Sequence, residues 1–472
     1  MNSGTCLQCE DQHMDATAAP LTARSDDGRS LVTPATNNPF AVGSLVIVDD
    51  GLHRQIALIE HRDDDRRIVR GRLLGVIADG ALDMRRSHAF GAAAMWAADG
   101  ASIDLMHEAT GATLEVGLDL SPPSGPVRLL PHRFNRHTFW CGQSGSGKTY
   151  ALGVVLEQLI AKTALSIVVF DPNSDFIRLG ELRDNATGPT ADALRDRDIR
   201  VLRPNTAGAE PLRARFLDMP VRSKAAVLQL DPVADREEFN ALLHLRDLLE
   251  QAQLERLIPT LLASDDPVHH RVALRLENLG LLGWEVWAGG GRAATDTIDE
   301  RPDATVLDLG GFSSPEQQLV VALAVLDELW ARREERRPLL LVIDEAHNLC
   351  SPQLESAVAV AVRERLLQIA AEGRKFGLWL LLSTQRPSKV HPGIISQCDN
   401  LGLMKMSSAA DLDGLATYFG YVPMGLMAQS LWFRQGEALF AGGFVAAPSL
   451  AKVKPRLTPE GGLDVSVPLR GG

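Results

Sequence analysis

The segment GQSGSGKT at residues 142–149 constrains the fold of this chain more than any other part of the sequence. It follows the apolar run HTFWC and precedes YALGVVLEQLIAK, whose apolar spacing predicts a helix. Two glycines five positions apart, then lysine and threonine, placed between a strand and a helix, form the P-loop pattern GxxxxGK[ST]. The alternative, a mobile surface loop that contains a lysine by chance, lacks a reason for the flanking strand and helix.

A P-loop holds phosphates through its backbone. Its glycines let successive N–H groups and the amino end of the following helix face one phosphate group. We expect Lys148 to bridge the β- and γ-phosphates of ATP and Thr149 to ligate Mg²⁺. The predicted nucleotide-binding residues are Gly142, Gln143, Ser144, Gly145, Ser146, Gly147, Lys148, Thr149 and Tyr150.

Further apolar runs predict the sheet that carries this loop. They read LSIVVFD, IRVLRP, ATVLDLG, LLLVIDE, GLWLLLSTQ and LGLMKM, and they alternate with helical patterns. Continuous apolar strands that alternate with helices are typical of a parallel sheet covered on both faces. One of the helices has a clear start, with Ser314 as N-cap, Pro315 in the first turn and Gln317 at the capping-box position. The predicted fold class is therefore α/β.

Two strands of this predicted sheet end in polar residues suited to ATP hydrolysis. LLLVIDEAH ends in Asp344 and Glu345, where one carboxylate can hold Mg²⁺ and the other can orient or deprotonate a water molecule. STQRP places Gln385 at the carboxyl edge of the sheet, where it can sense the γ-phosphate. The alternatives are a strand that ends in acids only to reach solvent and a glutamine that only caps its strand.

The order of the predicted strands, helices and polar segments along the chain predicts its domains. Residues 1–40 read as a disordered arm, because they are small, polar and without a period. Short β-rich runs, including SIDLMHEA and ATLEVGLDL, predict a small β-barrel or sandwich over residues 41–122. The linker SPPSGP at residues 121–126 marks the boundary, and we expect residues 123–446 to form the ATPase domain, with a helical insertion at about 215–300 and a carboxyl-terminal tail at 447–472.

Composition limits the possible partners and compartments. The net charge of −12 does not favour broad nucleic-acid binding, although a local basic channel is compatible with it. Five scattered cysteines do not make a disulfide framework, which favours a reducing compartment such as the cytoplasm. Neither a membrane span nor a signal peptide is expected. Cys6 and Cys9 with His13 supply three candidate zinc ligands where a structural site needs four, so no metal is expected there.

The motifs together resemble the HerA branch of the HerA and FtsK superfamily of hexameric motor ATPases. The resemblance rests on the P-loop, IVVFDPNSDF, LLLVIDEAHN and the block from EGRKFG through TQRPSK to ISQC, and it runs from about residue 40 to 447. It implies a RecA-like core after a small barrel, and a ring of six subunits that pulls double-stranded DNA through its pore.

The same resemblance assigns roles to single residues. It makes Lys148 and Thr149 the Walker A pair, Asp344 and Glu345 the Walker B pair, and Gln385 the sensor. It also implies that Arg374 of EGRKFG is an arginine finger that reaches the nucleotide of a neighbouring subunit, with Arg136 as a second charge at that interface.

The leading hypothesis is an ATP-driven DNA translocase or helicase. The sequence shows no nuclease motif of its own, so the resemblance implies a separate nuclease or effector, in DNA-end processing or anti-phage defence. The alternative is a nucleotide-dependent scaffold that assembles and activates a partner enzyme. A secretion or conjugation motor at a membrane is disfavoured, since no spanning segment is expected.

Overall fold

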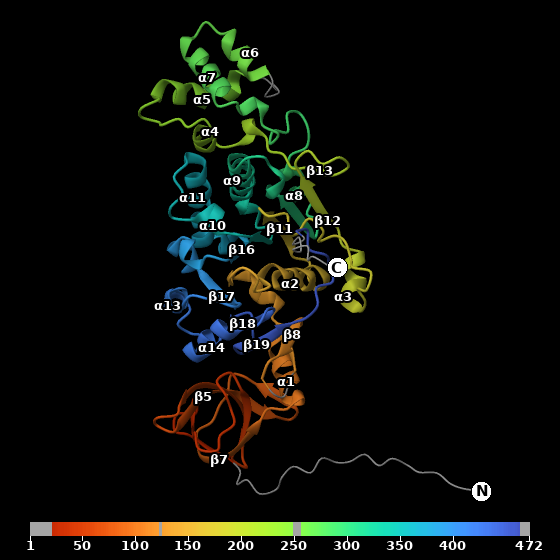
Figure 1. Cartoon of the computed structure of the whole chain (residues 1–472), viewed down its shortest axis with the longest axis vertical. Helices are drawn as coiled ribbons and strands as arrows, with labels where there is room; N and C mark the ends of the chain where they lie inside the picture. Colours follow the sequence, from red (N-terminus) through yellow and green to blue (C-terminus); the bar gives the residue numbers. More distant parts are fainter. Residues whose placement is uncertain (1–20, 122–124, 249–255, 463–472) are drawn as a thin grey trace, which may run out of the picture. The chain divides into compact units, whose positions relative to one another are not determined.

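The computed structural model describes residues 21–121, 125–248 and 256–462 (Figure 1). The chain divides into two compact units, residues 1–109 and 110–472. Among the described residues, no helix combines the length and the apolar character that crossing a membrane requires.

The first unit is an antiparallel β-barrel. Its strands are β1 (Leu21–Ser25), β2 (Ser30–Pro34), β3 (Leu45–Asp49), β4 (Arg54–Asp63), β5 (Ile68–Ala78), β6 (Ala81–Asp83) and β7 (Phe90–Ala97). They lie in the order β2-β1-β7-β3-β4-β5-β6, and a further pairing of β2 with β5 closes the barrel, leaving β6 beside β5. Alternate residues such as Val46, Val48, Ala57 and Ile59 fill its core, as the two-residue period of a strand requires.

The expected arm over residues 1–40 is wrong in its second half, because β1 and β2 form a hairpin of the barrel. Asp27 makes the turn: its side chain accepts hydrogen bonds from the backbone N–H groups of Arg29 (2.8 Å) and Ser30 (2.7 Å). Polar turn residues of this kind are easily read as disorder. Cys6, Cys9 and the rest of residues 1–20 lie outside the described residues.

The expected end of the barrel domain at residue 122 is also wrong. SIDLMHEA lies in helix α1 (Gly100–Thr110), and Asp99 accepts a hydrogen bond from the N–H of Ser102 (2.8 Å) at its start. ATLEVGLDL contains β8 (Leu114–Asp119), which pairs with β9 (Pro126–Leu129) and β19 (Ser449–Val453) in the second unit. Short strand patterns do not reveal which sheet they join, since the pairing partner is distant in sequence.

The second unit has a twelve-stranded sheet, and the predicted α/β class is confirmed. Its order is β13-β12-β14-β11-β15-β16-β10-β17-β18-β19-β8-β9. The run from β13 to β17 is parallel, while β18 turns back antiparallel to β17. The strands not yet given are β10 (His137–Cys141), β11 (Ser166–Asp171), β12 (Ile199–Arg203), β13 (Glu210–Pro211), β14 (Ala304–Asp308), β15 (Leu339–Ile343), β16 (Leu378–Thr384), β17 (Cys398–Leu403) and β18 (Glu437–Gly442).

Helices connect and cover these strands. The main ones are α2 (Lys148–Lys162), α3 (Pro189–Arg195), α9 (Pro315–Ala331), α11 (Ala357–Glu372), α13 (Ala409–Tyr418) and α14 (Met424–Gln429). The predicted N-cap of α9 is confirmed, because the Ser314 hydroxyl accepts a hydrogen bond from the N–H of Gln317 (3.4 Å). The capping-box position predicted for Gln317 is wrong, since its side-chain amide donates to the hydroxyl of Ser313 (3.0 Å). Between β13 and β14 the chain forms α4 (Val221–Val227), α5 (Arg236–Leu248), α6 (Leu257–Leu262), α7 (Pro267–Asn278) and α8 (Ala294–Asp299). Figure 1 shows α5, α6 and α7 grouped together beyond α4.

The expected tail from residue 447 begins instead with a strand of the sheet, β19, and then packs on helix α2. We call residues 454–462 the C-terminal strap. Glu157 of α2 is buried and accepts hydrogen bonds from the N–H groups of Leu457 (3.0 Å) and Thr458 (2.8 Å). Arg456 is also buried, with its guanidinium 5.4 Å from the centre of the Phe176 ring. A strap of this kind has no periodic pattern, so its sequence reads as a loop.

Because the strap packs on α2, we expect an alanine in place of a glycine of this helix to lower the stability of the protein. A Cβ at Gly153 would lie 2.6 Å from Cζ of the buried Arg456. Gly153→Ala is therefore expected to destabilise the protein by about 1–3 kcal/mol through overpacking. Gly414→Ala in α13 is the control, since a Cβ there meets nothing within 4 Å, and it should stabilise by about 0.5–1 kcal/mol. Thermal unfolding of both variants checks this, and equal shifts would contradict it.

Candidate functional site

The P-loop joins β10 to α2, and its glycines fit a tight curl of backbone. Gly145 and Gly147 have φ of 76° and 87°, a region that favours glycine. A Cβ at Gly142 would lie 2.7 Å from Cβ of Met404 and 2.8 Å from Oγ of Ser146. Helix α2 begins directly after this curl at Lys148, so its free N–H groups face the loop. Of the remaining loop residues, Ser144 is exposed, and Gln143 and Thr149 are half-buried.

Lys148 is buried between the acids predicted to share its site. Its Nζ lies 2.9 Å from Oδ1 of Asp344 and 3.2 Å from Oε1 of Glu345. It also donates to Oγ of Ser383 (2.7 Å), whose hydroxyl in turn donates to Asp344 (2.7 Å). Burial alone would lower the pKa of Lys148, but the two carboxylates raise it, so the ammonium stays charged. Ser383, which the sequence did not single out, thereby fixes both Lys148 and Asp344.

Asp344 and Thr149 fit the Mg²⁺ that the P-loop pattern implies. Oδ2 of Asp344 is buried without a hydrogen-bond partner among the described residues, as is Oγ of Ser146. No group of three or more His, Cys, Asp or Glu residues in the described part of the chain is placed to hold a metal. Mg²⁺ in nucleotide sites is usually bound through one or two carboxylates together with phosphate oxygens and water. One free carboxylate oxygen beside the P-loop suits such an ion.

Glu345 is held in an uncommon backbone conformation by its neighbours. Its φ is 42°, which is rare for a residue other than glycine. Gln385 donates from Nε2 to Oε1 of Glu345 (2.6 Å), and Nδ1 of His347 lies 3.2 Å from Oε2. Burial alone would raise the pKa of Glu345, but His347, Lys148 and Gln385 together lower it to about 2. The carboxylate is therefore ionised at neutral pH and suited to orienting a water molecule.

A second pair of acids, which the sequence analysis did not select as site residues, also lies at this edge. Asp171 ends β11 and accepts hydrogen bonds from the N–H groups of Asp175 (2.9 Å) and Phe176 (2.8 Å), while burial raises its pKa to about 7. Burial and the charge of Asp344 raise the pKa of Asp175 to about 6. The signal available in the sequence was the polar DPNSD that ends an apolar strand, the same pattern as in LLLVIDE.

Tyr150 was predicted to bind the nucleotide, and the structure gives it another partner. Its hydroxyl accepts a hydrogen bond from the backbone N–H of Arg456 in the C-terminal strap (2.7 Å). Its ring packs against the core of the second unit. The phenol is thus directed to the strap and not to the phosphate loop.

The two predicted interface arginines lie together at the amino edge of the sheet. Arg374 is in η7 (Gly373–Phe376), just before β16, and Arg136 directly precedes β10. Nη1 of Arg374 lies 2.9 Å, and Nε of Arg136 3.5 Å, from the same Oδ2 of Asp399. Because the P-loop, Asp344 and Glu345 follow the carboxyl ends of their strands, both arginines are remote from the phosphate loop of their own chain.

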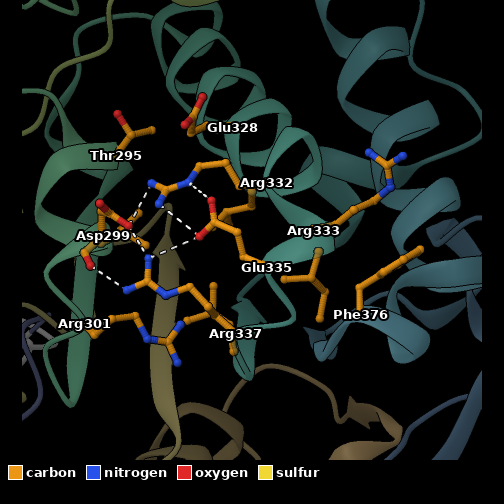
Figure 2. Close-up of a pocket in the computed structure, with 13 residues that line it drawn as sticks. Thr295, Asp299, Arg301, Glu328, Arg332, Arg333, Glu335, Arg337 and Phe376 are labelled. Atoms are coloured by element: carbon orange, nitrogen blue, oxygen red, sulfur yellow. Dashed lines mark hydrogen bonds and ion pairs between the residues drawn. The ribbon is translucent and has the colours of Figure 1, made fainter.

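A pocket also lies at the amino edge, beside the first residues of β15 and β16. Figure 2 shows Arg332 and Arg337 turned toward Asp299 and Glu335, with which they form ion pairs. These carboxylates already balance the two guanidiniums, and none of the predicted site residues lines the pocket. It is therefore separate from the candidate nucleotide site.

Comparisons with known proteins agree with this geometry. The family model described as Helicase HerA, central domain, matches residues 115–329. The chain is 31% identical over 152 residues to "Probable helicase MJ1565" of Methanocaldococcus jannaschii, covering 31% of this chain and 29% of that protein. It is 32% identical over 116 residues to "DNA double-strand break repair helicase HerA" of Pyrococcus furiosus, covering 25% and 20%. The matched segments thus span less than a third of these relatives.

A solved structure supports the fold. VirB4 of Thermoanaerobacter pseudethanolicus superposes with a TM-score of 0.50 at 15% sequence identity, covering 73% of this chain and 97% of that one. Together with the P-loop and the acids at the carboxyl edge of the sheet, the family match makes residues 115–329 similar to the central domain of HerA helicases, and the solved structure agrees with the α/β fold.

Proposed function

We propose that this protein hydrolyses ATP to move along, or unwind, double-stranded DNA. The observation that carries the proposal is the convergence of Lys148, Asp344 and Glu345 at one sheet edge, with Gln385 hydrogen-bonded to the same glutamate. The DNA substrate is inferred from the relatives named as DNA double-strand break repair helicases.

Each residue of this cluster has a distinct proposed role. Lys148 and the P-loop amides bind the phosphates of ATP, and Thr149 and Asp344 hold Mg²⁺, which neutralises phosphate charge when bound. Glu345 orients the attacking water molecule. Gln385 senses the γ-phosphate. Its amide contacts the carboxylate of Glu345, so a movement of Gln385 would change the position of that carboxylate.

We further propose that six subunits form a ring. Arg374 and Arg136 support this, because they are partly exposed at the edge remote from their own P-loop, where they are able to serve the nucleotide of a neighbouring subunit. The DNA would pass through the pore. Since the sequence carries no nuclease motif, a separate nuclease or effector would act beside this motor, in the cytoplasm, during DNA-end processing or anti-phage defence.

The proposal predicts that double-stranded DNA stimulates ATP turnover at low salt. The stimulation should fade steeply between about 50 and 200 mM salt, because each phosphate contact releases counterions. A coupled ATPase assay across a salt series, with ring assembly followed by mass, checks this. Turnover that is unaffected by DNA in assembled rings would instead favour the scaffold that assembles a partner enzyme.

A further inference from the structure

The chain between α14 and β18 lies against the phosphate loop and is hydrogen-bonded to it. We call residues 430–436 the flank segment. At one end of it, Gly436 donates its N–H to the carbonyl of Ser146 (2.9 Å). At the other end, the carbonyl of Ser430 accepts from the N–H of Met406 (3.0 Å), next to Lys405, whose carbonyl accepts from Gln143 of the P-loop (2.9 Å). The flank segment is therefore fixed to the P-loop both directly and through residues 405–406, which follow β17.

Trp432 lies in this segment and is exposed to solvent. The residue is 84% exposed, whereas its neighbours Ser430 and Phe433 are buried. The Ser430 hydroxyl also donates to the carbonyl of Met427 (2.7 Å), which secures the turn η9 (Ser430–Trp432). The indole is thus a free aromatic surface on a backbone that is anchored on both sides.

The order of the strands decides which end of a nucleotide would meet this surface. Asp344, Glu345 and Gln385, which are proposed to handle Mg²⁺ and the γ-phosphate, follow β15 and β16, on one side of β10. The flank segment precedes β18, on the opposite side of β10 beyond β17, and reaches the same edge because β18 runs antiparallel to β17. A triphosphate whose γ end points toward β15 must therefore extend its ribose and base toward the flank segment.

Trp432 is close enough along the chain to Gly436 for its indole to reach toward a base beside the P-loop. Four residues of extended chain span at most about 14 Å, and Trp432 lies four positions before Gly436, whose N–H contacts the P-loop. A turn in which the N–H of Glu437 donates to the carbonyl of Arg434 (3.0 Å) shortens this span further. The Cα atom of Trp432 consequently lies no more than about 14 Å from that of Gly436, on the side of the P-loop where the base of a bound nucleotide would emerge.

We propose that Trp432 stacks on the base of the bound nucleotide. The inference rests on the proposed function of the P-loop and adds the base-binding group, which neither the motifs nor the acids supply. Stacking on an aromatic ring tolerates any base, because every base has a π-face. Trp432 therefore raises affinity for nucleoside triphosphates in general and does not itself select adenine.

The experiment compares two ligands on the full-length protein, a non-hydrolysable ATP analogue and inorganic tripolyphosphate, which has the phosphates but no base. Trp432→Ala should weaken binding of the analogue about 10- to 100-fold and leave tripolyphosphate binding unchanged. Trp432→Phe should keep most of the affinity. Leu274→Ala, which truncates another exposed apolar side chain of the same unit, should change neither.

Each result that would contradict the proposal has a different meaning. Unchanged affinity for the analogue in Trp432→Ala overturns the stacking role while leaving ATP binding intact. Equal losses for both ligands overturn it as well, since they indicate a distorted P-loop. Loss of ring assembly with unchanged affinity assigns Trp432 to a subunit contact instead. A wild-type protein that binds neither ligand would refute nucleotide binding by the P-loop itself.

Discussion

Glu345→Gln is expected to bind ATP with about the affinity of the wild type and to lose turnover by about 10²- to 10⁴-fold. Glutamine keeps the shape of the side chain but removes the charge that orients the water molecule. That charge matters when the water attacks, and not when ATP binds. Single-turnover hydrolysis and equilibrium binding of ATP, measured on the same preparation, separate the two steps.

Lys148→Ala is the matched comparison, because it removes a positive charge that is proposed to contact the phosphates already in the bound state. It should lose binding itself. Removing Lys148 also leaves Asp344 and Glu345 without their shared cation, so thermal unfolding must show that the variant is folded. Wild-type turnover in Glu345→Gln would remove this glutamate from the mechanism.

Arg374→Ala is expected to reduce hydrolysis by about 10³-fold or more while ATP still binds and rings still form. A guanidinium supplied by the neighbouring subunit stabilises the charge of the transferring phosphoryl group. The ion pair with Asp399 is partly exposed, so its loss should cost little stability. Arg178→Ala, which breaks only a surface pair with Glu181, is the control.

Mixing two inactive variants tests whether Arg374 acts between subunits. In mixed rings of Arg374→Ala and Glu345→Gln, some interfaces combine an intact Glu345 site with an intact neighbouring Arg374, so partial activity should return. Mass measurement confirms that the rings contain both variants. If such rings stay inactive, Arg374 acts on its own subunit or has no role in hydrolysis.

The parts of the fold and site that the sequence predicted well are those encoded locally. The strands around the P-loop are continuous apolar runs, and the start of α9 is encoded by Ser314 and Pro315. Asp344, Glu345 and Gln385 were found because each follows a strand of the same parallel sheet, which brings their side chains to one edge.

The parts that were missed depend on contacts between distant segments. Ser383 bonds to Lys148 only because β16 lies between β10 and β15. The hairpin of β1 and β2, the change of sheet at β8 and the C-terminal strap likewise depend on partners far along the chain. Tyr150 follows the P-loop directly, yet its direction is set by Arg456, 306 positions away.

The contact between the C-terminal strap and helix α2 also joins two segments that are synthesised at different times. Glu157 and Leu457 are hydrogen-bonded across a separation of 300 residues. At about 5–20 residues per second, the ribosome adds Leu457 roughly 15–60 s after Glu157. During that interval the carboxylate of Glu157, on the helix that begins with Lys148, lacks the N–H groups of Leu457 and Thr458 that it accepts from in the folded chain. We therefore expect a nascent chain to carry a P-loop helix that takes its final place only when synthesis reaches the strap.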